Sequence, residues 1–122
     1  MLGLWHINAS FTEDLDLFKR LGMNLDIQAM DWATLVQRRA KPDPLDQGGW
    51  SVFQTSWGGV DHFNPAVHAF LRGNGKDAWF GWPTDEKMEA MRDAWMDSNS
   101  DAERKKLDQE IQLRAFEMVP YI

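Results

Sequence analysis

The feature that most constrains this chain is a short segment of strictly alternating character at residues 23–29. Apolar and polar side chains alternate there with a period of two, which is typical of a β-strand with one face on a core: Met23, Leu25, Ile27 and Ala29 against Asn24, Asp26 and Gln28. A second strand is expected at residues 50–57, which are rich in aromatic and β-branched side chains and bounded by glycines. Asp31 lies between them as the expected N-cap of a short helix. This succession of strand, helix and strand predicts a parallel crossover unit, so the expected fold class is α/β, a small sheet flanked by helices.

Capping signals predict further helices near both ends of the chain. Ser10 and Ser100 each begin an S-x-x-E sequence, a capping box that satisfies the first amides of a helix. Gly22 can adopt the left-handed conformation that ends the first of these helices, and Pro120 ends the last. The last helix carries an apolar stripe at helical spacing, made of Leu107, Ile111, Ala115 and Met118.

Two helices are expected between residue 64 and residue 97. Asn64 followed by Pro65 predicts a helix start, and this short helix is expected to run to Arg72, where glycines stop it. Thr84 is the expected cap of a longer helix. Its core-facing residues are Met88, Met91 and Trp95.

Length and composition set bounds on function. The chain has 122 residues, which favours a single domain over residues 1–122. It has 13 Lys and Arg against 19 Asp and Glu, a net charge of −6, which argues against nucleic acid as a partner. There is no cysteine for a disulfide or a thiolate, no apolar run near the ~20 residues of a membrane span, and no signal peptide pattern.

The best candidate for a ligand site is the glycine-rich turn that follows the second predicted strand. Ligands of open α/β sheets bind outside the carboxyl ends of strands, where loops present polar groups. Asp61 could pair there with a cationic group while Trp57 stacks on the ligand. The alternative is that Trp57 lies in the core and Asp61 caps the helix at Pro65. The expected ligand-binding residues in this turn are Ser56, Trp57, Gly58, Gly59, Asp61 and His62.

Residues 79–83 form a dense aromatic turn. Trp79, Phe80 and Trp82 cannot all face one core, because Gly81 and Pro83 force a bend between them. Exposed rings would add Trp79 and Trp82 to the ligand site, or would let the chain act as a stand-alone module that self-associates. The alternative is that the rings cover the longer helix.

An enzymatic function has little support in the sequence. His62 and His68 are six residues apart, a spacing that does not place both on one helical face. A zinc site would need Asp61 as a third ligand, and ordinary histidines are the alternative. Nucleophile, phosphate-loop and dinucleotide motifs are absent. We therefore expect no catalytic residue, no metal and no cofactor.

Several segments together resemble one protein family. The first comprises residues 17–26 (LFKRLGMNLD) and residues 28–32 (QAMDW), and it resembles a helix and strand followed by a D-W helix start. Residues 49–53, Trp57 and Asn64-Pro65 match the strand and turn that come next. The motifs GNG, AWFGWP and VPYI complete a pattern that runs from residue 17 to residue 122. This pattern is similar to the solute-binding proteins of peptide and nickel ABC transporters, also called extracellular solute-binding protein family five.

The resemblance implies a periplasmic receptor of two lobes that close on a short peptide or similar solute, delivered to a transporter permease. Residues 1–122 would form a partial domain, a segment of the C-terminal lobe of a type II periplasmic binding protein fold, without the first lobe. In peptide-binding members an Asp receives the amino terminus of the ligand. Asp61 matches that position when counted back from Pro65, whereas Val60 matches it when counted forward from Trp57. A homodimer of the fragment could cover surface that the rest of the lobe would otherwise cover.

Overall fold

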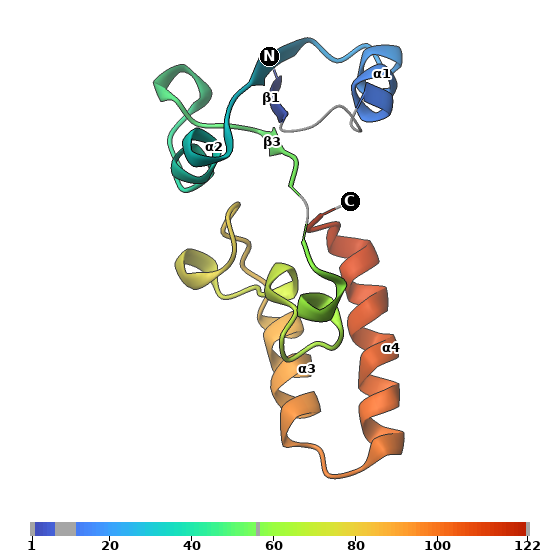
Figure 1. Ribbon diagram of the computed structural model, residues 1–122. Helices are drawn as coiled ribbons and strands as arrows, with labels where there is room; N and C mark the ends of the chain where they lie inside the picture. The colour runs from blue at the N-terminus through green and yellow to red at the C-terminus, as the bar shows by residue number, and fades with distance from the viewer. Residues whose placement is uncertain (1, 7–11, 56, 122) are drawn as a thin grey trace. The chain divides into compact units, whose positions relative to one another are not determined.

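The computed structural model describes residues 2–6, 12–55 and 57–121, with side chains described from Leu15 onward. Along the chain it divides into two compact units, Met1–Ser56 and Trp57–Ile122. The first unit carries the strands and the second carries the two longest helices (Figure 1). The expectation of one partial domain over residues 1–122 stays a prediction.

The first unit contains a parallel three-stranded sheet. Its strands are β1 (Leu2–His6), β2 (Leu25–Ala29) and β3 (Val52–Phe53), in the spatial order β2-β1-β3. Helix α1 (Thr12–Arg20) joins β1 to β2, and helix α2 (Trp32–Arg39) lies between β2 and β3 in the chain. Parallel strands connected by helices confirm the α/β class at this coarse level.

The strands differ from the expectation in two ways. No strand was predicted at residues 2–6, where β1 lies at the centre of the sheet between the two predicted strands. The strand expected at residues 50–57 is reduced to Val52–Phe53, which pair with Leu4 and Trp5 of β1.

The local signals around the first two helices agree well with the structure. Gly22 has a positive φ of 76°, and its N–H donates to the Lys19 carbonyl at 2.9 Å while Met23 N–H donates to Phe18 at 3.1 Å. These bonds form the expected glycine C-cap. Asp31 caps α2, because its carboxylate accepts from the Thr34 amide at 3.0 Å. The expected cap at Ser10 lies outside the described residues.

Burial along β2 does not follow the expected alternation. Ile27 and Ala29 are exposed, whereas Asp26 and Gln28 are half-buried. Gln28 donates to Asp26 at 2.8 Å and accepts from Arg38 of α2 at 3.2 Å, so helix contacts cover the polar face instead.

The second unit is built on a hairpin of α3 (Glu86–Asp97) and α4 (Asp101–Met118), which run side by side (Figure 1). Its core consists of buried Leu71, Met88 and Ile111, against which Met91, Trp95 and Ala115 pack. The expected apolar stripes of both helices are therefore confirmed for these residues. Met118, at the end of α4, is exposed instead.

The caps of this hairpin differ in detail from the expectation. Asp85, not Thr84, caps α3 by accepting from the Met88 amide at 3.2 Å. Asp85 also accepts from Arg114 of α4 at 2.9 Å, which ties the two helices together. Burial opposes ionisation of Asp85, but the bonds from Arg114 and Met88 outweigh it and lower its pKa. Thr84 instead forms an isolated antiparallel bridge with Asn74.

Ser100 caps α4 as expected, but the reciprocal half of its capping box is replaced. The Ser100 hydroxyl accepts from the Glu103 amide at 3.4 Å. The Glu103 carboxylate accepts from the Ser98 hydroxyl at 2.8 Å, and Ser98 in turn accepts from the Ser100 amide at 3.2 Å. Ser98 therefore does what the Glu103 carboxylate does in the standard motif.

The helix expected from Asn64 to Arg72 does not form, and only a 3-10 turn, η4 (Ala69–Leu71), lies there. The buried guanidinium of Arg92 on α3 donates to the backbone carbonyls of Pro65, Ala66 and His68 and holds them in a non-helical arrangement directed toward α3. A side chain distant in sequence overrides a sound local signal.

Substitution of Gly73 tests how closely the loop approaches α3. A Cβ at Gly73 would lie 2.8 Å from the Asp85 backbone nitrogen and 2.9 Å from its oxygen. We expect Gly73→Ala to lower the free energy of unfolding by roughly 1–3 kcal/mol in urea denaturation. Gly59→Ala is the control, since nothing lies within 4 Å of its added methyl. Equal stability of the two variants would contradict this contact.

Substitution of Arg92 tests the origin of the loop. Arg92→Lys keeps the charge but cannot reach three carbonyls at once, so buried acceptors are left unpaired. We expect a loss of roughly 2 kcal/mol or more in free energy of unfolding. Arg20→Lys, at an exposed position of α1, should be neutral. A neutral Arg92→Lys would show that the loop does not depend on the guanidinium fork.

Candidate functional site

The candidate site begins at a tight turn at the start of the second unit, η3 (Gly59–His62). The Asp61 amide donates to the Gly58 carbonyl at 3.0 Å, and the His62 ring contacts the same carbonyl through Nδ1 at 3.2 Å. A Cβ at Gly58 would lie 3.1 Å from an Asp61 carboxylate oxygen. Two contacts to the Gly58 carbonyl therefore hold the turn in place, and the Asp61 side chain lies over Gly58.

An aromatic cluster supports this turn. The Trp57 ring is held edge-on by Trp79 at 5.0 Å, Phe70 at 5.7 Å and His62 at 6.1 Å between ring centroids. Phe70 also contacts Trp79 at 4.9 Å. Rings in edge-to-face contact fix one another in orientation. Trp57 nevertheless remains 44% exposed, so part of its ring is open to a ligand.

His68 joins the turn to the other end of the unit. It is buried, its ring lies 4.5 Å from that of His62, and its Nε2 lies 2.9 Å from the hydroxyl of Tyr121. Burial, and after it the neighbouring His62 and Arg92, lowers the pKa of His68 to about 4. Burial raises the pKa of Tyr121, so this pair is neutral at pH 7.

The structure brings together most of the residues expected at the site. Trp57, Gly58, Gly59, Asp61 and His62 form the turn, and Trp79 packs directly on Trp57. The Trp82 ring contacts that of Phe80, with 6.5 Å between the ring centroids. Ser56 lies outside the described residues. The functional role of all eight residues stays a prediction.

Sequence reasoning did not place Phe70 and Tyr121 in the cluster, and it considered His68 only as a zinc ligand. They come from segments up to 53 residues apart and meet only in the folded unit. The one local signal was the spacing of His68 and Phe70, two residues apart in a short non-helical segment. It was obscured by the helix that Asn64-Pro65 predicts.

The aromatic turn at residues 79–83 is packed rather than displayed. Trp79, Phe80 and Trp82 are half-buried, with Trp79 and Phe80 rings 4.9 Å apart. Trp82 adopts a positive φ of 49°, which the bend between Gly81 and Pro83 imposes. The rings therefore contact one another and the group formed by Trp57 and Phe70. The alternative that they cover the longer helix stays a prediction.

A zinc site at Asp61, His62 and His68 finds no support in the geometry. Among the described residues, no group of three histidine, aspartate or glutamate side chains is arranged to hold a metal. His68 presents its Nε2 to Tyr121 instead.

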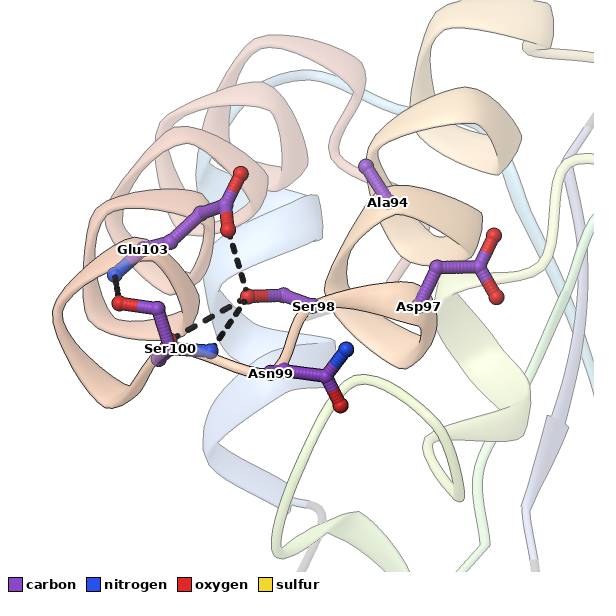
Figure 2. A pocket seen from close by; sticks show the side chains of 6 residues that line it. All are labelled: Ala94, Asp97, Ser98, Asn99, Ser100 and Glu103. Carbon is purple, nitrogen blue, oxygen red and sulfur yellow. Dashed lines mark hydrogen bonds between the residues drawn. The ribbon is translucent and has the colours of Figure 1, made fainter.

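A shallow hollow lies elsewhere, at the turn between α3 and α4. It is lined by Ala94, Asp97, Ser98, Asn99, Ser100 and Glu103 (Figure 2). Ser98, Ser100 and Glu103 bond to one another there, as the dashed lines in Figure 2 show. These polar groups serve the helix cap, and the hollow contains none of the expected site residues.

Comparison with known proteins identifies a relative of a defined class. Over 104 residues, the chain is 36% identical to a probable peptide ABC transporter periplasmic-binding protein of Sinorhizobium fredii. This match covers 85% of the chain and supports a relation at the level of the family. The chain spans 20% of the length of that relative. No family model matches the sequence.

No helix in the described part of the chain is long and apolar enough to cross a membrane.

The state of His68 predicts a pH dependence of stability. The unfolded chain binds a proton at the ordinary histidine pKa of 6.5, whereas folded His68 resists protonation until about pH 4. The contribution of neutral His68 to the free energy of unfolding is therefore complete above pH 6.5 and decreases as the pH falls below that value. Between pH 7 and pH 5 we expect the free energy of unfolding to drop by roughly 2 kcal/mol. Urea denaturation at several pH values measures it.

His68→Gln is the control for this prediction. It lacks the titrating group, so its stability should change much less over the same interval. Asp85 and Glu89 have a lowered pKa and lose their contributions only at lower pH, outside the interval. An equal drop in His68→Gln and the parent chain would assign the effect to another group.

Proposed function

We propose that this chain is part of the C-terminal lobe of a periplasmic solute-binding protein of an ABC transporter, and that its ligand is a short peptide. The observation that carries the proposal is the 36% identity over 85% of the chain to a probable peptide-binding protein of that class. The parallel sheet and its connecting helices are compatible with such a lobe. By the same likeness, the location is the periplasm and the transporter permease is the partner.

The proposed ligand side is the turn at Trp57–Asp61, together with His62, Trp79 and Trp82. Asp61 is exposed and lies on a turn that hydrogen bonds hold in place. A carboxylate in this setting can accept charge-assisted hydrogen bonds from a peptide ammonium group. Trp57 offers a partly open ring beside it. The proposed role is binding without catalysis.

A lobe of this kind contributes only one wall of a binding cleft. Ligand pockets usually enclose most of the ligand surface, and two-lobed receptors reach this by closing. In this proposal the missing wall belongs to the other lobe. The affinity of the 122-residue chain for peptides is then weak, in the millimolar range, and depends on Asp61.

The replacement of Asp61 tests the proposal. We expect Asp61→Asn to weaken peptide binding by roughly 1–3 kcal/mol, because the amide keeps the shape but not the charge. Binding to a mixed pool of short peptides is detected first as a rise in the thermal midpoint, since the ligand binds only the folded state. Individual peptides are then titrated by NMR.

Asp93→Asn, at an exposed position of α3, is the matched control and should bind as the parent chain does. Unchanged affinity in Asp61→Asn would remove Asp61 from the site. A melt that no peptide shifts, together with NMR spectra that millimolar peptide leaves unchanged, would contradict peptide binding by this chain.

A further inference from the structure

Two apolar side chains close to Asp61 in the sequence, those of Val60 and Phe63, are largely exposed to solvent. Val60 is 83% exposed and Phe63 is 80% exposed, the highest values among the large apolar side chains of the described residues. The Phe63 amide donates to the Val60 carbonyl at 3.4 Å. In 3-10 geometry, side chains three residues apart lie on the same side. Val60 and Phe63 thus form one apolar pair next to a carboxylate.

This exposure is not the result of a loose segment. His62, between Asp61 and Phe63, is anchored to the Gly58 carbonyl at 3.2 Å and packs on Phe70 at 4.7 Å and on His68 at 4.5 Å. The backbone that carries Val60 and Phe63 is therefore already ordered. A ligand that covers them does not have to order the turn, which lowers the entropic cost of binding.

The charge on the turn specifies the polar part of the ligand. None of the ion pairs within the described part of the chain involves Asp61. The arginines of this unit that form ion pairs bond to other carboxylates: Arg72 and Arg92 to Glu89, and Arg114 to Asp85 and Glu117. Asp61 can therefore take a cation from outside the chain.

The ligand that fits both features carries an ammonium group and a large apolar group a few bonds apart. In the amino-terminal residue of a peptide, the ammonium group and the side chain are both attached to the same carbon atom, Cα. Asp61 comes directly after Val60 and lies about a third of a turn away from the apolar pair in 3-10 geometry. A terminal residue bound at the edge between these two sides can direct its ammonium group to the carboxylate and its side chain to the apolar pair. Each side chain alone could meet other partners, but the combination selects this chemistry.

We propose that the turn selects peptides whose amino-terminal residue is large and apolar, with Asp61 holding the ammonium group and Val60 and Phe63 contacting the side chain. This inference rests on the proposed function and adds the ligand's first residue to it. The apolar contact discriminates between peptides, whereas the Asp61 contact is common to all peptides with a free amino terminus.

The test compares three tripeptides titrated into the 122-residue chain by two-dimensional NMR: leucyl-glycyl-glycine, triglycine, and N-acetylated leucyl-glycyl-glycine. We expect the leucyl peptide to bind roughly tenfold more tightly than triglycine, because it buries part of a leucine side chain. The acetylated peptide, which lacks the ammonium group, should lose binding relative to its free counterpart.

Variants assign the preference to the apolar pair. Phe63→Ala should reduce the tenfold preference to near unity while leaving triglycine affinity unchanged, and Val60→Ala should reduce it in part. Both side chains are exposed, so neither substitution removes core packing. Leu113→Ala is the matched control, because Leu113 of α4 is also exposed, at 64%, but lies far along the chain from the turn. It should keep the full preference.

Each failure points to a different conclusion. If Asp61→Asn weakens both free peptides but they bind equally, the apolar selection is wrong and the proposed function stands. If no tripeptide binds, both fail. If Phe63→Ala leaves the preference intact, or if it changes the sedimenting mass and not peptide binding, the pair is overturned as a ligand contact. The last result would make it a contact with a second copy.

Discussion

The second unit depends on one buried cation, the guanidinium of Arg92. Moving a charged group out of water is costly unless its donors find acceptors. Arg92 meets this requirement with three backbone carbonyls, those of Pro65, Ala66 and His68, and with Glu89 at 3.9 Å. Glu89 is itself fixed by Arg72 and by the Gly73 amide at 2.7 Å. Arg92 and Glu89 of α3 thus hold both ends of the segment between residues 65 and 73.

The candidate site inherits its order from this segment. Because Arg92 holds the carbonyl of His68, the imidazole of His68 is placed against His62, and Phe70 two residues later is placed against Trp57. The Asp61 turn then rests on side chains that α3 has positioned. The exposed groups of the site lie on a half-buried ring cluster, which in turn rests on the buried polar side chains His68 and Arg92. Such an arrangement keeps a turn in one conformation without covering it.

How far the sequence predicts this molecule depends on how local each determinant is. Asp31, Gly22 and Ser100 act on amides within a few residues, and their predicted roles agree with the structure. The apolar periods of α3 and α4 likewise predict the core. The helix predicted at Asn64-Pro65 does not form, because carbonyls of that segment bond to Arg92 of α3. Strand β1 was not predicted, because residues 2–6 carry no sequence pattern that indicates a central strand. At the site, the contiguous turn could be predicted, but its ring cluster joins segments that only the fold brings together.

The open turn also determines which of its contacts can discriminate between ligands. An ion pair at a surface gains little over hydration, roughly 0–1 kcal/mol, so Asp61 acts weakly while water surrounds it. Covering the turn lowers the local dielectric and strengthens the same pair. Val60 and Phe63 need no such change, because contact with them removes apolar surface from water directly. Under the proposed function, apolar contact should therefore separate one peptide from another in this chain, and the effect of Asp61 should fall at the lower end of its range. In a closed two-lobed cleft, the balance would shift toward the carboxylate.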